Sequence, residues 1–302
     1  MSNQRFPASR IVTERGPKRT GHVEHESQEA GERNSTYGGD VAIVQTFARG
    51  LAVIRAFGPD SSELTLSDVA RRAGIHRATA RRLLHTLVQV GYVWAEGNRF
   101  SLRPRIMELG YAYLSTLTLP EHALPHLKTL AARVGESTYL SVVDGYDNVC
   151  IAHVPVRRLW AATMTVGTQL PAFATASGRV IMSFYEDEVL DALLASGDFP
   201  QITPYTISDS AHLKKELSLI RRQGWALADQ ELEEGLRTLA VPVRQAGQVV
   251  AAISVTTLAR ASDSRSDRSL GFLQHLLEAE AAIEADLEVS HQTATNIHQA
   301  DG

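Results

Sequence analysis

The sequence predicts an α+β protein made of two domains joined by a helix. Its 302 residues are enough for two ordinary domains, and 44% of them are apolar, which is enough for packed cores. Residues 65–94 carry two short amphipathic patterns on either side of a glycine, and a predicted hairpin follows them. From Pro120 onward, strand patterns and helical patterns are mixed. Such a mixture is typical of antiparallel strands with helices on one face.

The N-terminal end of the chain divides into a tail and a helix. Residues 1–43 are polar, rich in glycine and glutamate, and without hydrophobic periodicity, so they are predicted to be a disordered tail. The following helix presents Leu51, Ile54 and Phe57 to a core and ends at Gly58-Pro59.

Residues 65–94 have the sequence form of a helix-turn-helix. Thr65 and Asp68 can cap the first helix reciprocally, and Gly74 can end it in the left-handed conformation. The second helix has an apolar stripe and a cationic outer face that suits the major groove of DNA. Arginine can pair with guanine edges, and threonine can contact a base or a thymine methyl group. An arginine-rich surface helix is the alternative interpretation.

The residues that follow favour the DNA-binding interpretation. Residues 91–104 read as two strands around Glu96-Gly97-Asn98, which would make the motif a winged helix-turn-helix spanning residues 44–105. The side chains expected to contact DNA lie on its helices and wing: Arg49, His76, Arg77, Ala78, Thr79, Arg81, Arg82, Arg99 and Arg103.

The charge distribution predicts an anionic partner for this domain. Residues 44–105 hold ten arginines against four acids, a net charge of +6. Residues 106–302 carry a net charge of −10, and in residues 1–43 the positive and negative charges are equal in number. A basic block in an acidic chain points to double-stranded DNA as the partner, because arginine contacts to phosphate supply most non-specific affinity.

The rest of the chain is predicted to form a linker helix (106–119), an α+β domain (120–290) and a second disordered tail (291–302). Within the α+β domain, helices are expected at 127–134, 177–197 with a break near 185–187, 208–224 and 266–288. Two hairpins are expected at 139–154 and 239–257.

Several classes of protein are disfavoured. One cysteine, Cys150, excludes an internal disulfide framework and fits a reducing cytoplasm. The N-terminus shows no secretory signal, and no apolar stretch is long enough to span a bilayer. The histidines have no ligand-like spacing, so we expect no structural metal and no cofactor.

Several segments, in order, resemble the IclR family of bacterial transcription regulators over residues 45–288. They read FARGLAVIRAF, RATARRLLHTL, LAARVGES, SVVDGYDNVCIAHV, GTQLPAFATASGRV, IRRQGWALADQE, EEGLRTLAVPV and VVAAISVTT. RATARR, HVPVRR and GTQLPAFATASGR are similar to the branch that controls aromatic catabolism through the β-ketoadipate pathway.

The resemblance implies a GAF-like effector-binding domain behind the winged helix-turn-helix, in a homodimer or homotetramer. It also implies a pocket lined by the turn before residue 178 and closed by an acidic loop. Three departures concern that pocket: Ala172-Phe173 where many members have Leu-His, Arg179 where many have lysine, and Ala228 where many have an acid.

The expected effector is a small carboxylate. Free N–H groups at a helix N-terminus favour a carboxylate, and a guanidinium grips one bidentately. Each assignment has a plain alternative: an ordinary helix cap at Ser177, a solvated acidic loop, or a surface position. The side chains expected to contact the effector are Arg157, Arg158, Ala176, Ser177, Gly178, Asp229, Thr238, Ser254 and Thr256.

The sequence therefore predicts a ligand-responsive regulator of an aromatic catabolic operon, without catalytic residues. A family member serving another carbon pathway, with a short organic acid as effector, is the first alternative. An enzyme with a DNA-docking domain is the second, although no nucleophile arrangement, phosphate loop or dinucleotide fingerprint is present. A constitutive architectural DNA binder would leave the acidic domain unexplained.

Overall fold

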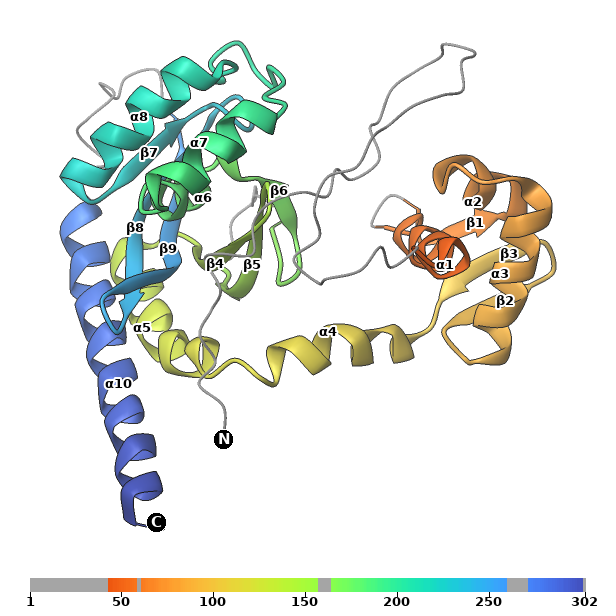
Figure 1. The fold of residues 1–302 in the computed structure, drawn as a ribbon, viewed down its shortest axis with the longest axis horizontal. Helices are drawn as coiled ribbons and strands as arrows, with labels where there is room; N and C mark the ends of the chain where they lie inside the picture. Colours follow the sequence, from red (N-terminus) through yellow and green to blue (C-terminus); the bar gives the residue numbers. More distant parts are fainter. Residues whose placement is uncertain (1–42, 59–60, 157–163, 260–270, 301–302) are drawn as a thin grey trace. The chain divides into compact units, whose positions relative to one another are not determined.

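The computed structural model describes residues 43–58, 61–156, 164–259 and 271–300 (Figure 1). Its two compact units meet in sequence at Ser115 and Thr116. The α+β prediction, with an N-terminal helix-turn-helix, is confirmed. No helix in the described ranges is both long enough and apolar enough to cross a membrane.

The N-terminal unit combines a helix-turn-helix with a three-stranded antiparallel sheet of order β1-β3-β2. Its elements are α1 (Gln45–Arg55), β1 (Glu63–Thr65), α2 (Leu66–Arg72), α3 (Arg77–Gln89), β2 (Val93–Glu96) and β3 (Arg99–Leu102). They are followed by the 3₁₀ turn η2 (Pro104–Ile106) and the helix α4 (Met107–Leu114). Helix α4 stands where the linker helix was predicted, but it ends at Leu114 rather than at residue 119.

Local sequence signals explain the start of α2 and the turn after it. The Thr65 side chain accepts from the Asp68 N–H, and the Asp68 carboxylate accepts from the Thr65 N–H, so the predicted capping box is present. Gly74 has a φ of +62°, the left-handed conformation that glycine adopts without strain. The prediction for α1 needs a correction. Phe57 is buried as predicted and Ile54 is half-buried, but Leu51 is exposed, and Val53 is fully buried in its place.

The C-terminal unit is built on a six-stranded antiparallel sheet of order β6-β5-β4-β9-β8-β7. The strands are β4 (Thr138–Asp144), β5 (Asp147–Val154), β6 (Gln169–Pro171), β7 (Ala226–Asp229), β8 (Leu236–Gln245) and β9 (Gln248–Leu258). The two predicted hairpins are β4–β5 and β8–β9.

Helices cover both faces of this sheet (Figure 1). Helix α6 (Ala176–Met182) packs on one face with α7 (Asp187–Ser196) and α8 (Ser210–Gln223) around it, and the turn η3 (Ala172–Ala174) precedes α6. Helices α5 (Leu119–Val134) and α10 (Leu273–Ala300) pack together on the other side. An apolar core lies between the sheet and helices α6, α7 and α8.

Three helical predictions need correction. Helix α5 starts at Leu119 rather than at residue 127, because Pro120 occupies the first turn, where a missing N–H costs nothing. The last helix starts at Leu273 instead of residue 266. It continues to Ala300, through residues predicted as a disordered tail, since residues 291–300 contain neither glycine nor proline to end it.

Candidate functional site

Helix α3 presents a row of exposed cations. Arg77, Arg81 and Arg82 are exposed, and none of them makes an ion pair or hydrogen bond with its side chain in the described part of the chain. Neighbouring arginines differ. Arg71 pairs with Asp68 at 2.9 Å, and Arg72 donates to Ser61 at 2.6 Å. The guanidinium groups of α3 are therefore available to an external anion.

Packing fixes the direction of this cationic face. Ala80 and Leu84 are fully buried, and Leu84 belongs to the core formed with Val53 and Val69. Because successive residues of a helix are about 100° apart, Arg82 lies on the side of α3 opposite Ala80 and Leu84, whereas Arg77 and Arg81 lie nearer the edge of the buried face and are exposed. Ala78 and His76 are exposed beside them, and Thr79 is half-buried.

The wing carries two of the arginines predicted to contact DNA, and their surroundings differ. Arg99 is exposed on β3, with Glu63 3.9 Å away. The Arg103 guanidinium lies 3.8 Å from the centre of the Trp94 ring, a cation–π contact that holds it against the sheet. Arg49 is exposed on α1. The structure thus places every predicted DNA-contacting residue in the N-terminal unit.

The C-terminal unit contains a cavity of about 230 Å³ between the sheet, the N-terminal end of α6 and the loop after β7. Its described lining is formed by these residues: Tyr139, Asn148, Met164, Thr168, Leu170, Ala174, Thr175, Ser177, Ala228, Glu231, Leu232, Glu233, Leu236, Thr238, Ser254 and Thr256. The strand residues among them share one face of the sheet, because directly paired residues point the same way.

Four predicted effector-binding residues line this cavity: Ser177, Thr238, Ser254 and Thr256. The Thr238 and Thr256 hydroxyl groups lie 3.1 Å apart on paired strands. Burial raises the pKa of the neighbouring Tyr139 phenol, so this group stays neutral at physiological pH.

The residue that caps the N-terminus of α6 differs from the predicted one. Thr175, not Ser177, caps α6, and its hydroxyl accepts from the Gly178 N–H at 3.1 Å. That N–H is therefore not offered to a ligand. Ala176 and Gly178 are buried but do not line the cavity. A Cβ at Gly178 would lie 2.3 Å from the carbonyl oxygen of Ala172, so glycine is needed here for packing.

Asp229 does not border the cavity. It follows Ala228 on β7, and successive residues of a strand point to opposite faces. Ala228 lines the cavity, while the Asp229 carboxylate accepts from Arg237 at 2.6 Å. The acidic loop borders the cavity through Glu231 and the exposed Glu233 instead.

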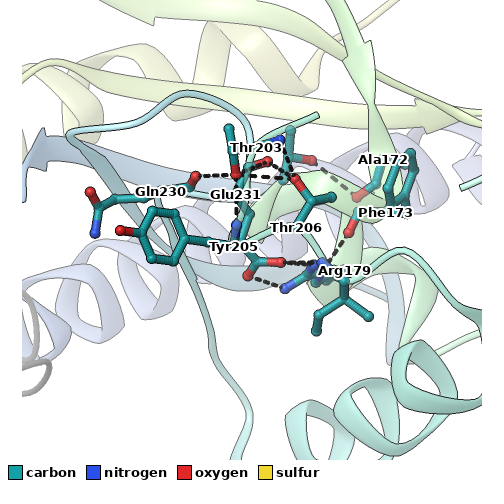
Figure 2. A network of polar contacts seen from close by, with 10 residues as sticks. Ala172, Phe173, Arg179, Thr203, Tyr205, Thr206, Gln230 and Glu231 are labelled. Atoms are coloured by element: carbon teal, nitrogen blue, oxygen red, sulfur yellow. Dashed lines mark hydrogen bonds and ion pairs between the residues drawn. The ribbon is translucent and has the colours of Figure 1, made fainter. Parts of the chain in front are cut away.

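Glu231 forms a buried ion pair that no pattern in the sequence predicted (Figure 2). Both carboxylate oxygens accept from Arg179 on α6, one of them at 2.6 Å, and Arg179 also donates to the Phe173 carbonyl. The side chains are 1% and 9% exposed. The hydroxyl of Thr206 donates to the Glu231 carbonyl at 2.6 Å, so side chain and backbone both hold this loop.

The charge of the described lining is negative. It includes Glu231 and Glu233 and no lysine, arginine or histidine. Arg157 and Arg158, the predicted partners of an acidic effector, lie outside the described residues. Within the described lining, the side-chain groups able to donate to a carboxylate are hydroxyls and the Asn148 amide.

Two family models match the chain. The IclR helix-turn-helix domain matches residues 46–96, and the C-terminal domain of the bacterial transcriptional regulator IclR matches residues 111–284. The Pca regulon regulatory protein of Pseudomonas putida is 38% identical over 250 residues, which cover 82% of this chain and 85% of that protein.

Two further similarities concern aromatic compounds. The p-hydroxybenzoate hydroxylase transcriptional activator of Acinetobacter baylyi is 35% identical over 213 residues, 68% of this chain and 79% of that protein. A crystal structure of an IclR homolog from Microbacterium hydrocarbonoxydans, complexed with 4-hydroxybenzoate, superposes with a TM-score of 0.69 at 28% identity. The match covers 81% of this chain and 99% of that chain.

Proposed function

Since the chain belongs to the IclR family of bacterial transcriptional regulators, we propose that it controls an operon for aromatic catabolism in response to a small aromatic acid. Its relatives include regulators named for the pca genes and for p-hydroxybenzoate hydroxylase. These relatives are regulators rather than enzymes, which argues against an enzyme with a DNA-docking domain.

The proposal that the N-terminal unit binds DNA rests on the arginines of α3, whose side chains have no partners among the described residues. Arg77, Arg81 and Arg82 are exposed on the second helix of the motif, the one that enters the major groove in such proteins. We assign base contacts to this helix, and phosphate contacts to Arg49, Arg99 and Arg103 around it. His76, Ala78 and Thr79 complete the proposed contact surface.

The effector part is supported by the cavity in the other unit. Its walls combine apolar side chains with a few hydroxyl groups, the usual character of a small-molecule site. We assign the effector carboxylate to the hydroxyls of Ser177, Thr238, Ser254 and Thr256. Arg157 and Arg158 remain our candidates for the positive charge that must offset Glu233, since Arg179 already pairs with Glu231, the other acid of the lining.

The proposed mechanism is a shift between two conformations of a homodimer or homotetramer. The effector binds one conformation better and so changes the spacing of the paired DNA-binding units. Because a dimeric helix-turn-helix protein mirrors its own symmetry, we expect a partly palindromic operator with half-sites about one DNA turn apart, or a multiple of it.

Binding of Arg81→Ala and Arg82→Ala variants to the upstream region of the gene tests the DNA assignment. A residue that reads bases should cost about 1–3 kcal/mol of sequence discrimination, and one that contacts phosphate should lower the salt slope by about 1. Arg222→Ala is the matched control, since Arg222 is an exposed arginine on α8 of the other unit. Wild-type binding by both α3 variants at all salt concentrations would disprove the assignment.

A thermal-shift panel of 4-hydroxybenzoate, protocatechuate, muconate, β-ketoadipate and phenol tests the effector class. A ligand at 100 times its dissociation constant stabilises the protein by about 2.7 kcal/mol. Ser177→Trp, which fills the cavity, should abolish the shift. A response to phenol alone, or one that survives in Ser177→Trp, would exclude an acid in this cavity.

A further inference from the structure

Among the described residues that line the cavity, Asn148 carries the one side-chain oxygen or nitrogen atom that is both fully buried and without a hydrogen-bond partner. It lies on β5, is 2% exposed, and its side-chain oxygen accepts no hydrogen bond from any described residue. Buried polar groups are almost always paired, because an unmade hydrogen bond in an apolar interior is costly. An unpaired amide in a cavity wall therefore points to a ligand group as its partner.

The hydrogen-bonding chemistry of the Asn148 Oδ1 atom limits which ligand groups can pair with it. An amide oxygen only accepts hydrogen bonds, and an ionised carboxylate only accepts as well. The carboxylate of an aromatic acid would therefore leave Oδ1 unpaired. A phenolic hydroxyl donates, so it satisfies Oδ1.

The sheet register places Asn148 far from the strand hydroxyl groups assigned to the carboxylate. Asn148 is paired with Val143 on β4, and Ser254 is paired with Tyr139 on the same strand. Four residues along β4 and two strand spacings across the sheet separate their backbones by roughly 16 Å. Side chains and hydrogen bonds take up part of this span, and Tyr139, directly opposite Ser254 on β4, also lines the cavity. This spacing suits a ligand with polar groups at opposite ends of a ring.

We propose that Asn148 determines effector specificity by accepting a hydrogen bond from a ring hydroxyl para to the effector carboxylate. The regulator then selects 4-hydroxylated benzoates over benzoate and over 2-hydroxybenzoate. This inference rests on the proposed function, because it assumes that the cavity binds an aromatic acid.

Isothermal titration of the full-length protein with 4-hydroxybenzoate, benzoate and 2-hydroxybenzoate tests the proposal. The wild type should prefer 4-hydroxybenzoate by about tenfold or more, since a site built to bind a hydroxyl rejects an analogue that lacks it. Asn148→Leu, similar in size but apolar, should bring the three affinities within about twofold of one another.

Ser141→Ala is the matched control. Ser141 is also fully buried on the sheet, and its hydroxyl also lacks a partner among the described residues, but it does not line the cavity. The Ser141→Ala variant should keep the wild-type preference. Asn148→Ala gives a second variant that should lose the preference if Asn148→Leu folds poorly.

Thermal unfolding without ligand separates recognition from a structural role. Asn148→Leu should unfold at the wild-type temperature or above, since it removes an unpaired buried amide. A lower unfolding temperature with an unchanged ligand preference would overturn the proposal. Equal wild-type affinities for 4-hydroxybenzoate and benzoate would overturn the role of Asn148 but leave the proposed effector class standing. If none of the three acids binds, both the role of Asn148 and the proposed effector class are wrong.

Discussion

Removing one partner of the Arg179–Glu231 ion pair should destabilise the C-terminal unit strongly. The Arg179 side chain is 1% exposed, and its hydrogen bonds go to Glu231 and the Phe173 carbonyl. Glu231→Leu leaves a buried guanidinium with that one carbonyl. Breaking a buried pair in this way costs about 3–5 kcal/mol, because the remaining charge is not compensated. For a unit of this size the loss lowers the unfolding temperature by roughly 6–20 °C.

Differential scanning calorimetry of single and double variants measures this effect. The double variant Arg179→Met with Glu231→Leu should regain most of the lost stability, because apolar side chains of similar volume often replace a buried pair at little cost. Lys214→Met is the control. Lys214 pairs with Asp191 at the surface, where both side chains are about half exposed, and an exposed pair contributes about 0–1 kcal/mol.

Two results would refute the reasoning. A loss below about 1 kcal/mol in Glu231→Leu would mean that water or rearrangement compensates the guanidinium. A double variant as unstable as the two single losses combined would mean that the two side chains do not act as a pair.

Two further predictions concern packing and pH. Gly178→Ala should cost about 1–3 kcal/mol or more, because the new methyl group meets the Ala172 backbone at 2.3 Å. Gly110→Ala in α4, where nothing lies within 4 Å, should not destabilise the fold, and equal thermal shifts for the two variants would contradict this packing argument. Burial raises the pKa of Glu280 to about 7 from 4.5, so the folded state retains a proton that the unfolded state releases. Stability should therefore fall as the pH rises from about 4.5 through 7, and Glu280→Gln should remove this part of the slope in urea titrations at several pH values.

Local signals in the sequence predicted much of the fold. The capping box at Thr65 and Asp68 fixed the start of α2, and the turn around Gly145 marked the β4–β5 hairpin. The strands β1, β6 and β7 were missed. Each has only three or four residues and is stabilised by pairing with distant strands, which periodicity does not register.

The candidate site was predictable only in part, for similar reasons. Thr238, Ser254 and Thr256 were placed on predicted strands, but the sequence left open whether their hydroxyls face a ligand or solvent, and the structure shows that they line the cavity. The Arg179–Glu231 pair joins residues 52 positions apart, and no local pattern connects them. The alternation of side chains along a strand would have excluded Asp229, since its apolar neighbour Ala228 marks the inward face of β7.

Cys150, on the paired strand β5, has a practical consequence for testing the two-conformation mechanism. It is the one cysteine of the chain, is 1% exposed, and burial raises the pKa of its thiol to about 11. Since the thiolate is the reactive form, maleimide dyes should leave it unmodified in the folded protein. A cysteine introduced at the exposed wing residue Asn98 would then be the single label of each subunit, and energy transfer between subunits would report directly how an effector changes the spacing of the DNA-binding units.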